Sequence, residues 1–150
     1  MTRRVDREIA FHLLFELCFQ PQEEVGALLE RRLDAAALAQ MAEEYAPYGE
    51  ELTGQDRAYI EDVVQGVQQK LDMLDEQISR YAENWSRQRL SKTTLTLLRL
   101  ALYEKDFVED VPLGAAINEA VELAKQYESE DAAGFINGIL GAVARGEKEE

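Results

Sequence analysis

The sequence contains few of the residues on which catalytic and metal sites usually depend. It has 150 residues but a single cysteine, Cys18, and a single histidine, His12. One cysteine cannot form an internal disulfide, so nothing calls for an oxidising compartment. Zinc sites and carboxylate-bridged metal bundles need several cysteine or histidine ligands, which excludes both. On a helix, His12 and Cys18 would point about 120° apart, which excludes a thiol–imidazole pair.

Phosphate-binding loops and membrane-spanning segments are missing as well. The sequence has no Gly-x-x-x-x-Gly-Lys loop and no Gly-x-Gly-x-x-Gly turn, the patterns that hold nucleotide phosphates. No apolar run approaches the roughly 20 residues that cross a bilayer. The N-terminus leads straight into an amphipathic pattern and lacks the cleavage region of a signal peptide. We therefore expect a cytoplasmic protein with no catalytic residue, no metal and no cofactor.

Proline and glycine are also scarce, and apolar residues at helical spacing fill the chain instead. Only three prolines and nine glycines occur, and no stretch alternates apolar and polar residues for long enough to form a strand. Hydrophobic residues make up 46% of the sequence, which is enough to build one core or two tightly packed halves. The pattern predicts an all-α fold of about seven helices.

Caps, prolines and apolar spacing place these helices along the chain. Their expected starts lie, in chain order, near Arg4, Glu23, Thr53, Leu71, Ser91, Pro112 and Ser129. The first helix should run to Phe19 and stop at Pro21, and the second should run to Tyr45, before Pro47. Residues 146–150 are expected to fray.

Two of the expected helices carry sharper signals. Leu95, Leu98 and Leu102 lie three and four residues apart, and further apolar residues beside them widen the stripe. This helix is therefore expected to be central and largely buried. Gly134 and Gly138 lie four residues apart on the last helix. Their spacing predicts a groove where another backbone comes close.

Acidic residues dominate the charge of the chain. There are 30 acidic and 16 basic residues, for a net charge of -14. Taken alone, this charge repels nucleic acid beyond a Debye length of roughly 8 Å and favours a basic protein partner. One acid-free island, residues 84–103, carries Arg87, Arg89, Lys92 and Arg99. A solvated face that balances nearby acids explains this island as well as a binding site does.

Four blocks of the sequence carry a more specific pattern. They are RVDREIA at residues 4–10, DRAYI with VQGV within 56–67, LLRLALYE at 97–104, and a last block of VP at 111–112, INEAVELAK at 117–125 and FINGIL at 135–140. In this order they resemble the bacterial transcription antitermination factor NusB family. Together they span most of the chain and leave mainly the acidic second helix unmatched.

The resemblance implies a fold and a function. The fold is all-α, with two packed helical subdomains over about residues 1–83 and 84–146. The implied function is not enzymatic. Members of the family bind the single-stranded boxA element of nascent ribosomal RNA together with ribosomal protein NusE, and so help RNA polymerase in the elongation complex to resist termination.

The resemblance also carries over individual residues. Proteins hold single-stranded RNA by placing cations on its backbone and aromatic rings on its bases. The implied RNA-binding residues are Arg3, Arg4, Arg7, Arg99, Lys125, Tyr127 and Phe135. Phe15, Thr94 and Asp131 fall at positions that bear on NusE binding in the family. The RNA-binding role requires a small cationic strip, where the first helix meets Arg99, that is open to solvent.

Other interpretations remain open at this level. A helical adaptor that binds only proteins also fits the charge of -14, because Asp6 and Glu8 interrupt the N-terminal arginines. A NusB-like domain of the kind fused to RNA cytosine methyltransferases is disfavoured, since no cofactor-binding strand pattern is present. Whether the chain is a monomer or forms a homodimer is left open.

Overall fold

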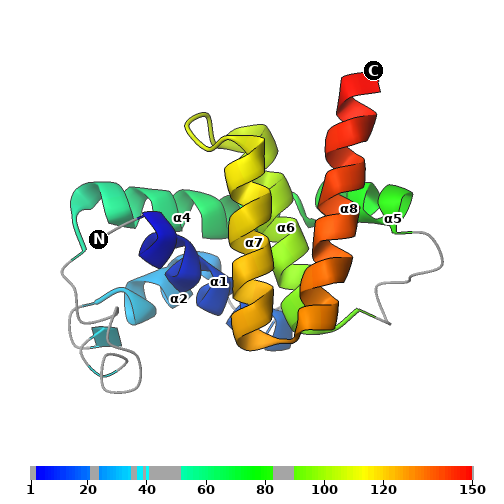
Figure 1. Cartoon of the computed structure of the whole chain (residues 1–150). Coiled ribbons are helices and arrows are strands. Elements are labelled where there is room, and N and C mark those ends of the chain that lie inside the picture. The colour runs from blue at the N-terminus through cyan, green and yellow to red at the C-terminus, as the bar shows by residue number, and fades with distance from the viewer. Residues whose placement is uncertain are drawn as a thin grey trace. The chain divides into compact units, whose positions relative to one another are not determined.

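The described part of the chain consists of helices and short connections. The computed structural model describes residues 3–20, 24–34, 37–38, 40, 52–82 and 90–149, and these ranges contain no strand. Their helices are α1 (Arg3–Phe19), α2 (Val25–Arg32), α4 (Gly54–Gln69), α5 (Leu71–Tyr81), α6 (Lys92–Phe107), α7 (Leu113–Tyr127) and α8 (Glu130–Glu149) (Figure 1). The predicted all-α fold class is confirmed.

Side-chain caps fix three of the expected helix starts. The Ser91 and Ser129 hydroxyl oxygens each accept a hydrogen bond, at 3.0 Å, from the backbone N–H three residues further on. Thr53 and Asp56 cap α4 reciprocally. The Thr53 Oγ1 accepts from the Asp56 N–H at 3.1 Å, and the Asp56 Oδ2 accepts from the Thr53 N–H at 2.9 Å. The caps predicted for α4, α6 and α8 are therefore confirmed.

The second helix is shorter than the sequence predicts. α2 ends just before Leu33, whose φ of -100° and ψ of 5° leave the helical region, so an unbroken helix to Tyr45 is wrong. The helix end leaves carbonyl oxygens without an intrahelical donor. Arg57 from α4 supplies one, because its Nη2 donates to the Leu33 carbonyl oxygen at 2.6 Å. The stops expected at Pro21 and Pro47 lie outside the described residues.

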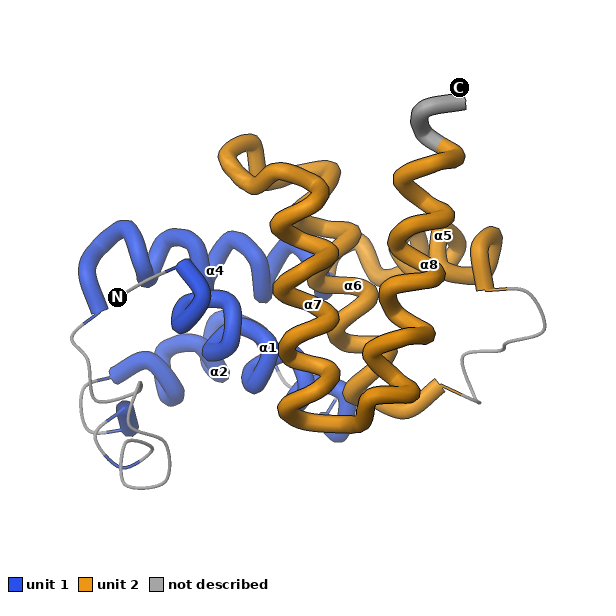
Figure 2. Tube along the Cα trace, viewed as in Figure 1, with its two compact units in different colours: residues 1–68 blue, residues 69–150 orange. Residues whose placement is uncertain are grey.

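The chain divides into two compact units, residues 1–68 and residues 69–150 (Figure 2). The expected halves divide near residue 83, whereas the observed boundary lies before α5. The reason is that α5 packs against α6 and α8 and so joins the second unit.

The first unit contains α1, α2 and α4. Its core is built from aliphatic side chains that recur at helical spacing, among them Ile9, Leu13, Leu17, Leu28, Ile60, Val63 and Val67. An ion pair joins α1 to α2, since the Arg32 Nε donates to the Glu16 Oε2 at 3.1 Å.

In the second unit, α6 is the central helix. It contacts α5, α7 and α8, and α7 and α8 pack along each other (Figure 1). Every residue from Thr94 to Glu104 is buried, with the exception of Arg99. Burying one leucine side chain contributes roughly 1.5–3 kcal/mol, so this helix carries much of the stability of the unit. The expected central, buried helix is confirmed.

The last helix differs from expectation at its glycines and at its end. Gly134 and Gly138 are exposed, and a Cβ added at either would meet no described atom within 4 Å, so no described part of this chain occupies the expected groove. α8 continues to Glu149, whereas the sequence predicts fraying from residue 146. At Gly146 a Cβ would collide with the Tyr81 hydroxyl, which shows that α5 lies close to this end.

We predict that Gly134→Ala stabilises the protein, because helix-interior glycine costs up to about 1 kcal/mol relative to alanine and nothing fills the added space. Gly146→Ala is the matched control and should stabilise less than Gly134→Ala, because the added methyl group must displace the Tyr81 ring. Urea denaturation followed by circular dichroism measures both. A loss of stability in Gly134→Ala would contradict the open environment of Gly134.

Candidate nucleic-acid interface

The first turn of α1 presents two of the predicted RNA-binding arginines. Arg3 and Arg4 are exposed. The Arg3 guanidinium lies over the ring of Tyr59 on α4, 4.4 Å from the ring centroid. This cation–π contact orients the arginine within the first unit and contributes on the order of 0.5–1 kcal/mol.

Arg7 lies differently from its neighbours. It is 5% exposed, so the expectation that it offers an open guanidinium is wrong. The reason is its helical position, since Arg7 shares a face of α1 with the buried Phe11 and Leu14, four and seven residues further on. The cationic group that α1 presents to solvent is therefore Arg3 with Arg4.

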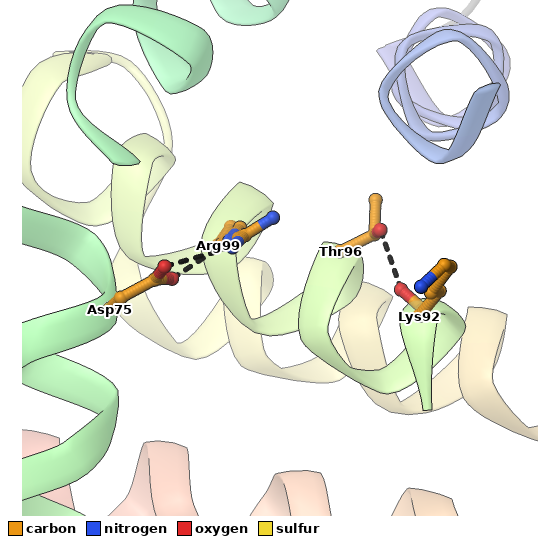
Figure 3. Close-up of polar contacts among 4 residues, drawn as sticks. All are labelled: Asp75, Lys92, Thr96 and Arg99. Atoms are coloured by element: carbon orange, nitrogen blue, oxygen red, sulfur yellow. Dashed lines mark hydrogen bonds and ion pairs between the residues drawn. The ribbon is translucent and has the colours of Figure 1, made fainter. Parts of the chain in front are cut away.

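Arg99 is bound by an acidic residue of its own unit. Its Nε and Nη2 donate to the two carboxylate oxygens of Asp75 on α5, both at 2.8 Å (Figure 3). The Arg99 and Asp75 side chains are only 13% and 6% exposed. A cation on the otherwise buried α6 needs a counter-charge, and this bidentate pair supplies it. The expectation that Arg99 offers an open guanidinium to RNA is therefore wrong.

Two of the four cations of the acid-free island, Lys92 and Arg99, lie within the described residues. Lys92 is exposed at the first position of α6, and its carbonyl oxygen accepts a hydrogen bond from the Thr96 hydroxyl at 2.6 Å (Figure 3). Arg87 and Arg89 lie outside the described residues. Of the four cations of the island, Lys92 is exposed and Arg99 is paired.

The remaining predicted RNA-binding residues gather where α7 turns into α8. Lys125 is exposed and Tyr127 is half-buried in the last turn of α7, and Phe135 is half-buried in the second turn of α8. Asp131, expected to bear on NusE binding, is exposed in the first turn of α8. We call these four residues the α7–α8 corner. It combines a cation with two partly accessible aromatic rings, which are the groups that single-stranded RNA requires.

The connection inside the α7–α8 corner is short, and both of its backbone amides are hydrogen-bonded. The Glu128 and Ser129 amides donate to the Ala124 carbonyl oxygen at 2.9 and 3.0 Å, and Ser129 caps α8. Asp131 lies near the positive end of the α8 dipole, where a carboxylate is stabilised. The corner is therefore held by backbone and cap hydrogen bonds.

Electrostatically, the α7–α8 corner is mixed. The Lys125 Nζ lies 3.7 Å from the Glu122 Oε1, and both side chains are about half exposed, at 44% and 52%. An exposed pair of this kind contributes little, so Lys125 can exchange this contact for a phosphate at small cost.

The residues expected to meet a protein partner also differ in exposure. Phe15 is half-buried between the rings of Phe11 and Phe19, at centroid distances of 6.2 and 5.1 Å. Phe19 is 60% exposed, so this row of rings reaches the surface. Thr94 is 5% exposed in the first turn of α6, so its side chain offers little surface for direct contact with a partner.

The two residues weighed for catalysis lie on α1. His12 is half-buried, and its burial lowers the pKa of the imidazole below the ordinary value. Cys18 is half-buried. Within the described ranges no three histidine, cysteine, aspartate or glutamate side chains cluster to bind a metal ion. None of the described helices combines the length and apolar character needed to cross a membrane.

Sequence reasoning missed the acidic residues that lie inside the two units. Asp75 falls on the apolar face of α5, one position after Leu74 and three before Ile78. Asp6 likewise shares a face of α1 with Ile9 and Leu13. An acid on an apolar stripe is the signal that could have found both, because a buried carboxyl group needs a partner.

We predict that Arg99→Met lowers the free energy of unfolding by about 3–5 kcal/mol, because the buried Asp75 would lose the bidentate pair with Arg99. The double variant Arg99→Met, Asp75→Leu should recover most of this loss, because the buried carboxylate is removed together with the guanidinium. Urea denaturation of both variants and the Asp75→Leu single variant completes the double-mutant cycle. Additive losses in the double variant would show that the two side chains do not act as a pair.

Comparison with known proteins places the chain in a family. The sequence model of the NusB family matches residues 4–145. The transcription antitermination protein NusB of Nitratidesulfovibrio vulgaris is 40% identical, over 96% of this chain and 88% of that protein. The protein of the same name from Natranaerobius thermophilus is 42% identical, over 96% of this chain and 95% of that protein.

Solved structures agree with the sequence comparison. NusB of T. maritima superposes with a TM-score of 0.80 at 35% identity, over 97% of this chain and 92% of that one. A crystal structure of the antitermination factors NusB and NusE in complex with dsRNA gives a TM-score of 0.75 over 96% of each chain. Its 24% identity shows a shared fold alone. The chain therefore belongs to the NusB family, as the four sequence blocks predict.

Proposed function

We propose that this chain is a transcription antitermination factor. In this proposal it binds the single-stranded boxA element of nascent ribosomal RNA together with ribosomal protein NusE, in the cytoplasm, and helps the elongation complex to resist termination. The observation that carries the proposal is the family match over residues 4–145. The names of relatives 40% and 42% identical to the chain support the antitermination role.

We assign the RNA contacts to the side chains that solvent reaches. Arg3 and Arg4 on α1 would bind phosphates in the first unit. Lys125, Tyr127 and Phe135 in the α7–α8 corner would bind a phosphate and stack bases in the second unit. Arg7 and Arg99 are not part of this assignment, because Arg7 is buried and Arg99 is paired to Asp75.

The charge of the chain supports a partner that brings cations of its own. A net charge of -14 opposes long-range attraction of RNA and attracts a basic protein. Phe15 and Phe19 on α1, and Asp131 in the α7–α8 corner, offer an aromatic and an acidic contact for NusE. The partner and the RNA would then stabilise each other on the chain.

We predict that RNA binding is weak for the chain alone and rises about tenfold or more, roughly 1.4 kcal/mol, when NusE is present. Fluorescence anisotropy of labelled boxA RNA, titrated at several salt concentrations with and without NusE, measures this difference. If about three phosphates are neutralised, log K should fall with log salt at a slope near -2. Equal affinity with and without NusE would contradict the proposal.

We also predict that Arg3→Gln, Arg4→Gln lowers RNA affinity in the NusE complex and reduces the salt slope by about 1.4, at roughly 0.7 per phosphate contact. The matched control is Arg31→Gln, Arg80→Gln, which removes the same charge from exposed arginines on α2 and α5. Helical content should not change in either double variant. An equal loss of affinity in both would point to net charge instead of a defined contact.

The burial of Arg7 and the pairing of Arg99 favour a second candidate function, that of an adaptor that binds only proteins. With Arg7 buried and Arg99 paired, fewer cations are available to RNA than the family pattern implies. Ultraviolet crosslinking of boxA RNA in the NusE complex separates the two candidates. Crosslinks to α1 or to the α7–α8 corner support RNA binding, whereas retention of NusE without such crosslinks supports the adaptor.

A further inference from the structure

Two carboxyl groups are buried together between α1 and α4 in the first unit. Asp6 on α1 is 3% exposed and Asp56 at the start of α4 is 5% exposed. The two carboxyl groups lie within hydrogen-bonding reach of each other. An ionised carboxylate has no hydrogen to donate, so a hydrogen bond between them requires one proton on the pair.

The surroundings of each carboxyl group indicate which one carries that proton. The Asp56 Oδ2 accepts hydrogen bonds from the Thr53 N–H and the Thr53 hydroxyl, both at 2.9 Å, and such bonds favour the ionised form. The Asp6 Oδ1 is buried and has no hydrogen-bond partner among the described residues. Leaving a charged oxygen in that state is costly, so the proton resides on Asp6.

We propose that Asp6 and Asp56 share one proton, and that this proton holds the first turn of α1 against the start of α4. The same turn carries Arg3 and Arg4, and the contact of Arg3 with Tyr59 is a second link between these two helix starts. Loss of the proton would leave two buried like charges side by side. The turn that carries Arg3 and Arg4 would then loosen. The resulting loss of RNA affinity rests on the proposed function.

Burial, hydrogen bonds and nearby charges shift the pKa values of Asp6 and Asp56. Burial is the largest effect on Asp6, and with the hydrogen bond and the charge of Asp56 it raises the pKa of Asp6 to about 7, although Arg3 and the α-amino group oppose this. Burial also acts to raise the pKa of Asp56, but the hydrogen bonds from Asp6 and Thr53 outweigh it and lower that pKa. The pair titrates as a unit, with its upper step near neutral pH.

The two pKa shifts determine how the free energy of unfolding depends on pH. Between the ordinary value of 3.8 and the raised pKa of about 7, the folded chain keeps a proton on Asp6 that the unfolded chain has lost. The contribution of this proton to the free energy of unfolding therefore falls as pH rises through that range and is gone above it. The contribution of Asp56 has the opposite sign and is lost in acid, as pH falls through its lowered pKa.

The variant Asp6→Asn tests the shared proton, because its amide group can donate to Asp56 at every pH. Between about pH 5.5 and about pH 8.5, the Tm of this variant should rise relative to the wild type by roughly 4 °C or more. Asp72→Asn is the matched control, since Asp72 is an exposed aspartate in the first turn of α5. Its Tm difference from the wild type should not change with pH. Carbon-13 NMR of the Asp6 carboxyl group should show a titration midpoint near 7.

RNA binding tests the functional consequence. In the presence of NusE, the boxA affinity of the wild type should fall relative to Asp6→Asn by about threefold or more over the same pH range. Parallel pH profiles for the two proteins would overturn the link to the arginines. If neither protein binds RNA at any pH, the proposed function fails, whereas the Tm and NMR measurements still decide whether the proton is shared.

Two results would overturn the shared proton itself. The first is an Asp6 carboxyl group that titrates at its ordinary value, together with a Tm difference that does not depend on pH. The second is stabilisation of the wild type, and not of Asp6→Asn, by magnesium ions at about pH 8.5. That result would assign the pair to a bound cation instead.

Discussion

The ion pair between Arg99 and Asp75 is the constraint around which the second unit is built. α6 is buried from Thr94 to Glu104, so a guanidinium within it must meet a counter-charge on a neighbouring helix. Asp75 provides that charge from α5 with two hydrogen bonds, and this fixes α5 in both rotation and register against α6. α5 therefore belongs with the C-terminal helices, and the arginine that resembles a nucleic-acid contact in the sequence serves the fold.

The same logic separates the structural charges from those available for binding. Arg7 is buried and Arg99 is paired, whereas Arg3, Arg4 and Lys125 are exposed. An RNA-binding surface on this chain consequently depends on few cations, in two separate units. A chain with a net charge of -14 gains from a basic partner when it holds RNA, which agrees with a role in an assembly.

Much of the fold was predictable because helix signals are local. The caps at Thr53, Ser91 and Ser129 and the apolar stripe of α6 depend on residues a few positions apart, and all of them are found as predicted. Other features depend on contacts between residues distant in sequence. The pairing of Arg99 spans 24 residues, and the open space at Gly134 depends on how α8 is placed. Periodicity alone says which face a residue is on but not what lies opposite it.

The short connection between α7 and α8 has a consequence for the geometry of the proposed binding surface. Only Glu128 and Ser129 separate the two helices, and both amides bind the same carbonyl oxygen. A residue inserted into this connection would have to break one of these bonds or bulge outward, because the apolar face of α8 keeps the helix packed on α6 and α7. The two-residue link therefore leaves no slack between the last turn of α7, which carries Tyr127, and the start of α8.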